Sequence, residues 1–147
     1  MRRLLGQRCY VDANVLVYFL ERDERWHSTV DPLFESAAQM RLRLVTGDAA
    51  VAEVMVLPYR SGRAELVGRF AQFFGSAEII DVLPHTSADF DRAARIQAER
   101  PMRMMDALHL ATAAIGGCSY IVTNDLRMRS VPGMEVVQLQ DLEELDG

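Results

Sequence analysis

Short apolar segments alternate with longer segments of helical periodicity along most of this chain, and that alternation constrains the fold more than any other feature. Apolar runs of four or five residues, bounded by turn residues, have the length of buried strands. The intervening segments repeat apolar residues every three or four positions, as one face of a helix does. Strands joined through helices form a parallel sheet with helices on its faces. The sequence therefore predicts an α/β fold, whose functional crevice lies at the carboxyl ends of the strands.

The predicted elements follow one another without a repeat or a linker-like segment, so a single domain is expected over residues 1–147. The predicted strands cover residues 8–11, 42–46, 79–83, 119–122 and 135–138. The predicted helices cover residues 14–20, 28–40, 49–59, 63–74, 86–99 and 104–115. Thr86 and Asp89 form a capping-box pattern at the start of the fifth helix, and Gly116 ends the sixth. The acidic tail, residues 141–146, is expected to be a solvated chain end.

Composition excludes several classes of protein. The chain has 147 residues, 50% of them hydrophobic and 25% charged, which is ordinary for a globular domain. Its apolar runs are too short for a membrane span, and its first residues lack the apolar core of a signal peptide. Cys9 and Cys118 lie in apolar segments, so reduced thiols and a cytoplasmic location are expected. The net charge of −5 argues against binding nucleic acid by bulk electrostatics alone.

Four acidic residues stand where local structure gives little reason for an acid. Asp12 and Asp125 each end a predicted strand segment. Glu53 and Asp106 lie in almost wholly apolar helices. Each also has a structural alternative: a helix cap or an Asx turn at the strand ends, a helix-dipole contact for Asp106, and an arginine pair for Glu53. Glu53 is the hardest to explain in this way, because an ionised glutamate is rarely buried without a partner.

Taken together, the four acids are better explained by one metal site than by four separate structural roles. The strand ends and helix faces of an α/β sheet can bring all four into one crevice. Crowded carboxylates repel one another, which raises their pKa values on average and favours a divalent cation that neutralises them. Oxygen ligands without a histidine or cysteine set favour Mg²⁺ or Mn²⁺. Such metal ions serve phosphoryl chemistry, because they activate water and stabilise the leaving oxygen.

Four sequence blocks resemble, in order and spacing, the PIN domain family, and more specifically the VapC-type toxins of toxin–antitoxin pairs. The blocks are residues 10–18, 52–54, 106–113 and 122–125, and the resemblance runs from residue 8 to about residue 140. It implies a parallel sheet with strand order 3-2-1-4-5 and a metal-dependent endoribonuclease. The catalytic and metal-binding acids would be Asp12, Glu53, Asp106 and Asp125. The supporting polar residues would be Asn14, Thr123 and Asn124.

The resemblance also implies partners and a reaction. The substrate would be RNA, cut by metal-activated water to leave a 5′-phosphate and a 3′-hydroxyl, with Mg²⁺ or Mn²⁺ as cofactor. The partners would be a small cognate antitoxin and a second copy of the chain. One departure is Gly47, where many relatives carry Ser or Thr, and Thr46 offers the nearest hydroxyl. Whether Asn124 or Asp125 faces the metal is left open by the sequence.

Two other functions fit parts of the pattern. A Mg²⁺-dependent phosphatase or phosphoacceptor domain also has an aspartate at a strand end, but it clamps the phosphoryl group with a lysine, and this chain has no lysine. Asp12, Ala13 and Asn14 also depart from the Asp-x-Asp pattern of haloacid-dehalogenase-type phosphatases. A solitary or non-catalytic PIN domain that binds RNA is the second alternative, and the intact acidic quartet disfavours it.

Three further side chains have two interpretations each. His109 lies one helical turn from Asp106 and is expected to pack within its apolar helix instead of joining the site. Trp26 and His27 lie in a charged connection, where they could stack on an RNA base or pack against the next helix.

Overall fold

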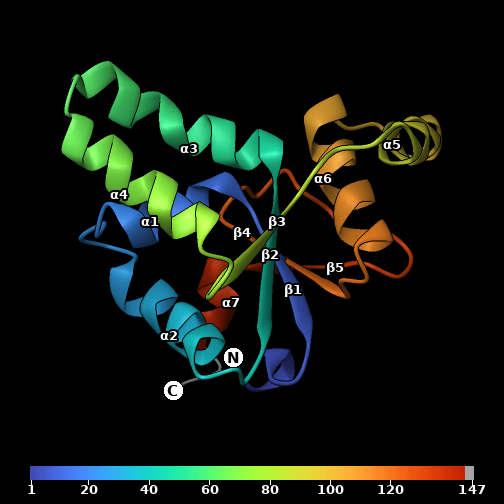
Figure 1. Cartoon of the computed structure of the whole chain (residues 1–147). Helices are drawn as coiled ribbons and strands as arrows, with labels where there is room; N and C mark the ends of the chain where they lie inside the picture. The colour runs from blue at the N-terminus through green and yellow to red at the C-terminus, as the bar shows by residue number, and fades with distance from the viewer. Residues whose placement is uncertain (145–147) are drawn as a thin grey trace.

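The computed structural model describes residues 1–144 and contains one five-stranded sheet (Figure 1). Its strands are β1 (Arg8–Val11), β2 (Arg43–Gly47), β3 (Ile80–Leu83), β4 (Tyr120–Thr123) and β5 (Glu135–Gln138). They lie in the order β3-β2-β1-β4-β5, and neighbouring strands are parallel. The predicted α/β class and the strand order implied by the PIN resemblance are both confirmed.

Helices connect the strands and cover both faces of the sheet (Figure 1). They are η1 (Arg2–Leu4), α1 (Ala13–Leu20), α2 (His27–Ala38), α3 (Asp48–Ser61), α4 (Ala64–Gly75), α5 (Ser87–Glu99), α6 (Met104–Ile115) and α7 (Leu139–Glu144). α5 begins with the predicted capping box, in which the Thr86 hydroxyl accepts from the Asp89 N–H and the Asp89 carboxylate accepts from the Thr86 N–H. Within residues 1–144, none of the helices has the length and apolar character needed to cross a bilayer.

Side chains that alternate along β1 divide the hydrophobic core into two layers. Cys9 and Val11 pack into the layer that holds Phe34 of α2, whereas Tyr10 between them packs into the layer that holds Leu110 of α6. Successive residues of a strand point to opposite faces of the sheet. A strand with helices over both faces carries apolar side chains on both, which explains why Cys9, Tyr10 and Val11 follow Arg8 as an unbroken apolar run.

α7 corrects the expectation that the acidic tail is a solvated chain end. Leu139 is fully buried and Leu142 is 2% exposed, and both belong to the core layer that also contains α2. The two leucines are three residues apart, so they lie on one face of the short helix. The acidic residues around them hid this apolar pair in the sequence. Asp146, in the same predicted tail, lies outside the described residues.

Trp26 packs instead of offering a free ring surface. It is 8% exposed, stacks on Tyr18 with 6.1 Å between ring centroids, and has the Arg25 guanidinium 4.8 Å from its ring centre. Trp26 is thus packed, as one interpretation expected, although its stacking partner lies on α1, the preceding helix, and not on the next one. The two cysteines are also buried and free, as expected. Burial raises the pKa of the Cys9 thiol to about 12 and that of Cys118 to about 11, so both stay protonated at neutral pH.

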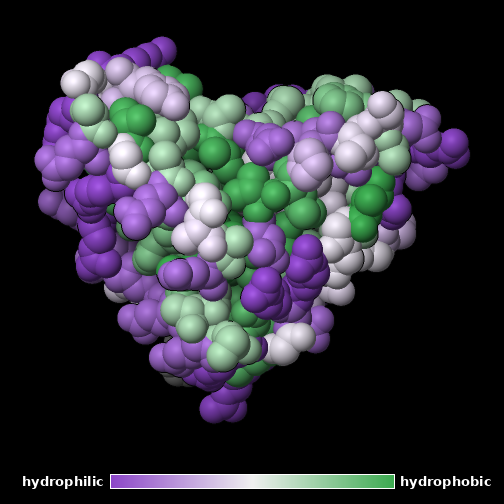
Figure 2. All heavy atoms as spheres, viewed as in Figure 1, coloured by the Kyte–Doolittle hydropathy of each residue, from purple (hydrophilic) through white to green (hydrophobic). Residues whose placement is uncertain are grey.

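The surface is notched between a lobe formed by α3 and α4 and a lobe formed by α5 and α6 (Figure 2). Hydrophobic side chains gather in this notch. Exposed apolar residues of the bordering helices include Val56, Leu57 and Tyr59 of α3 and Met104 and Met105 of α6. Exposed apolar side chains at this density on one helix are typical of a surface that meets another molecule.

Candidate active site

All four acids singled out by the sequence line one cavity, of about 410 Å³, at the carboxyl ends of β1 and β4. Val11 pairs with Val122 in the sheet, so the residues that follow them, Asp12 and Thr123, emerge side by side. α3 contributes Glu53 and α6 contributes Asp106. The remaining lining residues are Ala13, Asn14, Arg103, Met104, Met105, His109 and Asp125. The fold thus collects acids from four separate segments of the chain.

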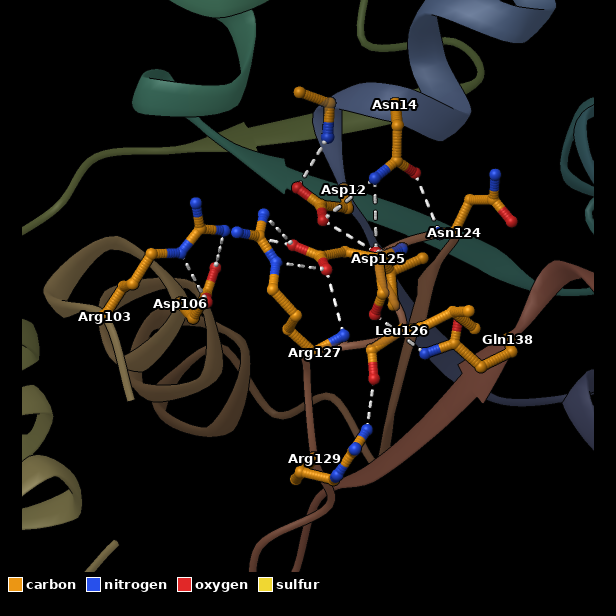
Figure 3. Close-up of polar contacts among 12 residues, drawn as sticks. Asp12, Asn14, Arg103, Asp106, Asn124, Asp125, Leu126, Arg127, Arg129 and Gln138 are labelled. Carbon is orange, nitrogen blue, oxygen red and sulfur yellow. Dashed lines mark hydrogen bonds and ion pairs between the residues drawn. The ribbon is translucent and has the colours of Figure 1, made fainter. Parts of the chain in front are cut away.

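Asp12 combines a structural role with its place in the cavity. Its Oδ1 accepts the Ala13 N–H at 2.8 Å, which makes it the amino-terminal cap of α1. Its Oδ2 accepts the Thr123 hydroxyl at 2.8 Å and the Asn14 amide at 3.3 Å. The residue is only 9% exposed. The capping alternative considered from the sequence is therefore correct, and the same hydrogen bonds fix the carboxylate at the cavity wall (Figure 3).

In the turn after β4, the side chains of Asn124 and Asp125 point in different directions, which answers the question of which one faces the site. Asp125 lines the cavity, and its N–H donates to Thr123 Oγ1 at 3.0 Å. The Asn124 side chain instead donates to Tyr18 Oη at 3.1 Å, while its N–H donates to Asn14 Oδ1 at 3.0 Å. Of the two, Asp125 is therefore the residue whose side chain faces the cavity, and Asn124 points toward Tyr18. Asn14 and Asn124 support the site by joining α1 to the turn.

Two arginines, which the sequence analysis did not place in the site, contact its acids (Figure 3). Arg103 donates from Nε and Nη2 to the Asp106 carboxylate at 3.1 and 3.2 Å, and from Nη2 to Asp125 Oδ2 at 3.0 Å. Arg127 donates from Nε and Nη2 to Asp125 at 3.0 and 3.1 Å. The hydrogen bond from Arg127 is the main reason why the pKa of the Asp125 carboxyl lies below its ordinary value. The signal available for Arg103 was its position three residues before Asp106, which is the spacing of a helical ion pair.

Glu53 differs from the other three acids because it is exposed at the edge of the cavity. The expectation that it is a buried acid is wrong: α3 turns this residue toward the opening. Partial loss of hydration raises the pKa of Glu53, and the charges of Asp12 and Asp106 raise it further, against the lowering effect of Arg103. The expected rise in pKa from crowding therefore holds for Glu53, whereas the pKa of Asp125 shifts the other way because of its arginine partner.

The donor set suits Mg²⁺ or Mn²⁺, because carboxylate and amide oxygens are the ligands that these ions prefer. In the described part of the chain, however, no three acidic, histidine or cysteine side chains converge closely enough to hold a metal ion as they stand. Asp106 and Asp125 are instead each paired with the Arg103 guanidinium.

A second polar network lies behind the cavity, and the sequence analysis missed its central residue, His85. His85 Nε2 accepts the Ala49 N–H at 3.1 Å, and Nδ1 donates to Thr112 Oγ1 at 2.7 Å, which in turn donates to Asp89 Oδ2 at 3.1 Å. His109 is buried, as expected, with Tyr10 Oη 2.7 Å from its Nδ1, but it also lines the cavity, contrary to the expectation that it stays outside the site. Nothing in the local sequence marks His85, because its hydrogen-bond partners, Ala49 and Thr112, lie on two other elements, α3 and α6.

The same network explains the glycine at position 47. A Cβ on Gly47 would lie 2.5 Å from His85 Cε1 and 2.5 Å from Tyr10 Oη, so any larger residue there would force these side chains to shift. Thr46 does not replace the missing hydroxyl, because its side chain is fully buried and donates to the Val11 carbonyl at 2.8 Å. The imidazole of His85 instead accepts a backbone N–H at the start of α3, that of Ala49.

The sequence profile of the PIN domain family matches residues 9–134, a range that includes all four acids of the cavity. The chain belongs to the PIN domain family. The match covers β2, β3, β4 and all of β1 except Arg8, and it ends one residue before β5 (Glu135–Gln138). The resemblance drawn from four short blocks is confirmed at the level of the family.

Solved PIN structures share this fold at low sequence identity. A toxin–antitoxin complex from Klebsiella pneumoniae superposes with a TM-score of 0.69 and 17% identity, over 89% of this chain and 97% of that one. DNA-bound VapBC from Salmonella typhimurium superposes with a TM-score of 0.64 and 18% identity, over 90% of this chain and 98% of that one. VapC20 of Mycobacterium tuberculosis is described as a toxin that cleaves the sarcin–ricin loop. It superposes with a TM-score of 0.60 and 17% identity, over 77% of this chain and 86% of that one. A comparison with curated protein sequences finds no significant match.

Proposed function

We propose that this PIN domain is a Mg²⁺- or Mn²⁺-dependent endoribonuclease that acts as the toxin of a toxin–antitoxin pair. The observation that carries the proposal is the single cavity, at the carboxyl ends of two parallel strands, that Asp12, Glu53, Asp106 and Asp125 all line. Four carboxylates around one opening destabilise an empty site and favour cations there. The absence of lysine from the sequence argues against the phosphatase alternative, which needs one to hold the phosphoryl group.

The solved relatives support the biological part of the proposal. One is a toxin that cleaves the sarcin–ricin loop, and others are toxins in complex with antitoxins. By extension to this chain, the substrate is RNA, the regulatory partner is a small antitoxin, and the protein acts in the cytoplasm as a homodimer. The exposed residues Val56, Leu57 and Tyr59 of α3 provide apolar surface that an antitoxin or a second copy would cover.

The residues that would hold the metal are Asp12, Asp106 and Asp125, with Glu53 at the rim. When bound there, Mg²⁺ or Mn²⁺ supplies Lewis-acid activation of water and stabilises negative charge on the scissile phosphate. Thr123 and Asn14 keep the Asp12 carboxylate in a single orientation, because both donate to its Oδ2. The raised pKa of Glu53 and its open position suit its carboxylate to accept the proton that the attacking water releases.

The proposed function is tested by RNA cleavage with the purified protein and a total RNA preparation. Cleavage is expected to stop when EDTA is added and to return with Mn²⁺ or Mg²⁺. Asp12→Asn keeps the size of the side chain but removes a ligand charge, so the rate should fall about 100-fold or more. Asp91→Asn is the matched control, because Asp91 lies on α5 and pairs with the exposed Arg95.

Two results would contradict the proposal. One is cleavage that EDTA leaves unchanged, which would exclude metal dependence. The other is an Asp12→Asn protein as active as Asp91→Asn, which would place the chemistry elsewhere. A protein that binds RNA but never cleaves it under any metal condition would favour the alternative of a non-catalytic PIN domain.

A further inference from the structure

Arg103 occupies the space between two acids of the cavity. It is the residue before α6, and its extended backbone places the side chain across the start of that helix. Its guanidinium contacts both oxygens of Asp106 and reaches Asp125 Oδ2 at 3.0 Å (Figure 3). One cation thus bridges two carboxylates that come from different elements, α6 and the turn after β4.

The burial of the three groups shows which of them can move. The side chains of Asp106 and Asp125 are 10% and 16% exposed, whereas the side chain of Arg103 is 55% exposed. Two nearly buried anions need a neutralising partner, and a planar guanidinium provides paired hydrogen bonds to them. The arginine itself can swing into solvent without opening the core. Among the described residues, the Arg103 guanidinium donates its hydrogen bonds to these two carboxylates.

Arg127 offers a contrast within the same cluster. It also pairs with Asp125, through both Nε and Nη2, but it does not line the cavity and does not contact Asp106. Its backbone N–H donates to Asp125 Oδ1 as well. Arg127 therefore holds Asp125 from outside, whereas Arg103 stands between the acids on the cavity side.

We propose that Arg103 is a built-in counter-cation of this site: it neutralises Asp106 and Asp125 when no metal is bound, and it must leave before a divalent cation binds them. This inference rests on the proposed metal-dependent function. When binding requires such a displacement, the apparent dissociation constant equals the intrinsic one divided by the fraction of molecules in the open state. Removing the guanidinium is therefore expected to strengthen metal binding and to weaken the metal-free fold.

The released guanidinium has a second consequence. Once free of the carboxylates, it stays tethered at the rim of the cavity, because the backbone of Arg103 is fixed at the start of α6. A guanidinium in that position can pair with a phosphate oxygen of RNA. The same residue would thus neutralise the empty site and contact the substrate in the loaded one.

The experiment measures Mn²⁺ binding to the full-length protein by isothermal titration calorimetry. Arg103→Gln is expected to bind Mn²⁺ about three- to tenfold more tightly than the wild type and to melt at a lower temperature without metal. Arg103→Lys keeps the charge but loses the two-sided bridge, so it should also bind Mn²⁺ more tightly. Arg127→Gln removes an equally close charge from outside the cavity and should change the affinity less. Arg95→Gln, from a surface pair, should change nothing.

A measurement on the wild type removes any dependence on how the variants fold. The Arg103 Nε–H should give an NMR signal that shifts when diamagnetic Mg²⁺ is added, because its carboxylate acceptors are lost. Equal Mn²⁺ affinity of wild type, Arg103→Gln and Arg103→Lys, with an unmoved Nε–H signal, would overturn the inference while leaving the metal-dependent function in place. If none of the proteins bound Mn²⁺, both would fall. If Arg103→Gln and Arg127→Gln tightened binding equally, general electrostatics would explain the effect and the inference would be wrong.

Discussion

Thr123 links two acids of the site through one hydroxyl group. The side chain is fully buried at the end of β4. Its Oγ1 donates to Asp12 Oδ2 at 2.8 Å and accepts the Asp125 N–H at 3.0 Å. Because a hydroxyl has one proton, the direction of the first bond is determined once Asp12 is ionised. The orientation of Asp12 and the shape of the turn that carries Asp125 therefore depend on the same atom.

Replacing this hydroxyl should damage the site more than the core. Thr123→Val has nearly the same shape but leaves a buried carboxylate oxygen and a backbone N–H with one partner fewer. We expect the free energy of unfolding to fall by about 1–3 kcal/mol. RNA cleavage should fall as well, because Asp12 loses its fixed orientation. Thr123→Ser keeps the hydroxyl and serves as the control in urea denaturation and cleavage assays. A Val variant that matched the Ser variant in both would show that this hydroxyl does not organise the acids.

At the scale of elements, α3 is capped by a side chain from another part of the chain. The residue before the helix, Gly47, has no side chain that could accept a hydrogen bond. His85 Nε2 takes that place by accepting the N–H of Ala49, the second residue of α3. The Thr112 hydroxyl of α6 accepts from the other ring nitrogen. One imidazole thus couples the helix that carries Glu53 to the helix that carries Asp106.

This arrangement predicts an unusual response at position 47. Serine is a favourable cap in general, yet Gly47→Ser should destabilise the protein by about 1–3 kcal/mol, because its Cβ would overlap His85 and Tyr10. His85→Ala should also destabilise, since α3 loses its cap. In the double variant the serine has more room and can cap the helix, so the combined loss should be smaller than the sum of the single losses. Urea denaturation of the four proteins measures this coupling, and strictly additive losses would contradict it.

At the scale of the whole molecule, two histidines sit where the sheet, α3, α5 and α6 meet. The His85 and His109 rings lie edge to face with centroids 5.9 Å apart. Burial lowers the pKa of both. Nearby carboxylates partly oppose this: Asp89 and Asp48 act on His85, and Asp12 and Asp106 act on His109. The His85 ring must be neutral here, because its Nε2 accepts a hydrogen bond from the Ala49 N–H.

The lowered histidine pKa values predict how stability depends on pH. A group whose pKa is lower in the folded state binds fewer protons there than in the unfolded chain, so stability rises with pH. The contribution is complete above the unfolded value of about 6.5 and is lost as the pH falls below it. The free energy of unfolding of the metal-free protein should therefore decrease from pH 7.5 to pH 5.5.

His85→Gln identifies the source of that pH dependence. Its amide oxygen can still accept the Ala49 N–H, but the residue no longer titrates. Urea denaturation in EDTA at several pH values should give a shallower slope for His85→Gln than for the wild type. Stability that increased on acidification would mean that the raised pKa of Glu53, which acts in the opposite direction, outweighs the histidines.

The sequence by itself determined the class of the fold, most of the elements and the four acids of the cavity. These depend on local patterns: apolar runs of strand length, helical spacing, and the capping box of Thr86 and Asp89, which the structure reproduces. Local reasoning failed at α7, where two leucines three residues apart were hidden among acids. The strand order came from the resemblance of ordered blocks to the PIN family, because no local pattern specifies which strands are neighbours.

Only the tertiary structure decided how the site is arranged. It turned Asp125 to the cavity and Asn124 toward Tyr18, exposed Glu53 at the rim, and placed Arg103 between Asp106 and Asp125. It also brought His85 to the start of α3, which explains Gly47. The physical reason is the same in each case. Hydrogen bonds and ion pairs depend on distances of about 3 Å between groups from different elements. Those distances are set by how the strands pair and how the helices pack, which sequence spacing does not encode.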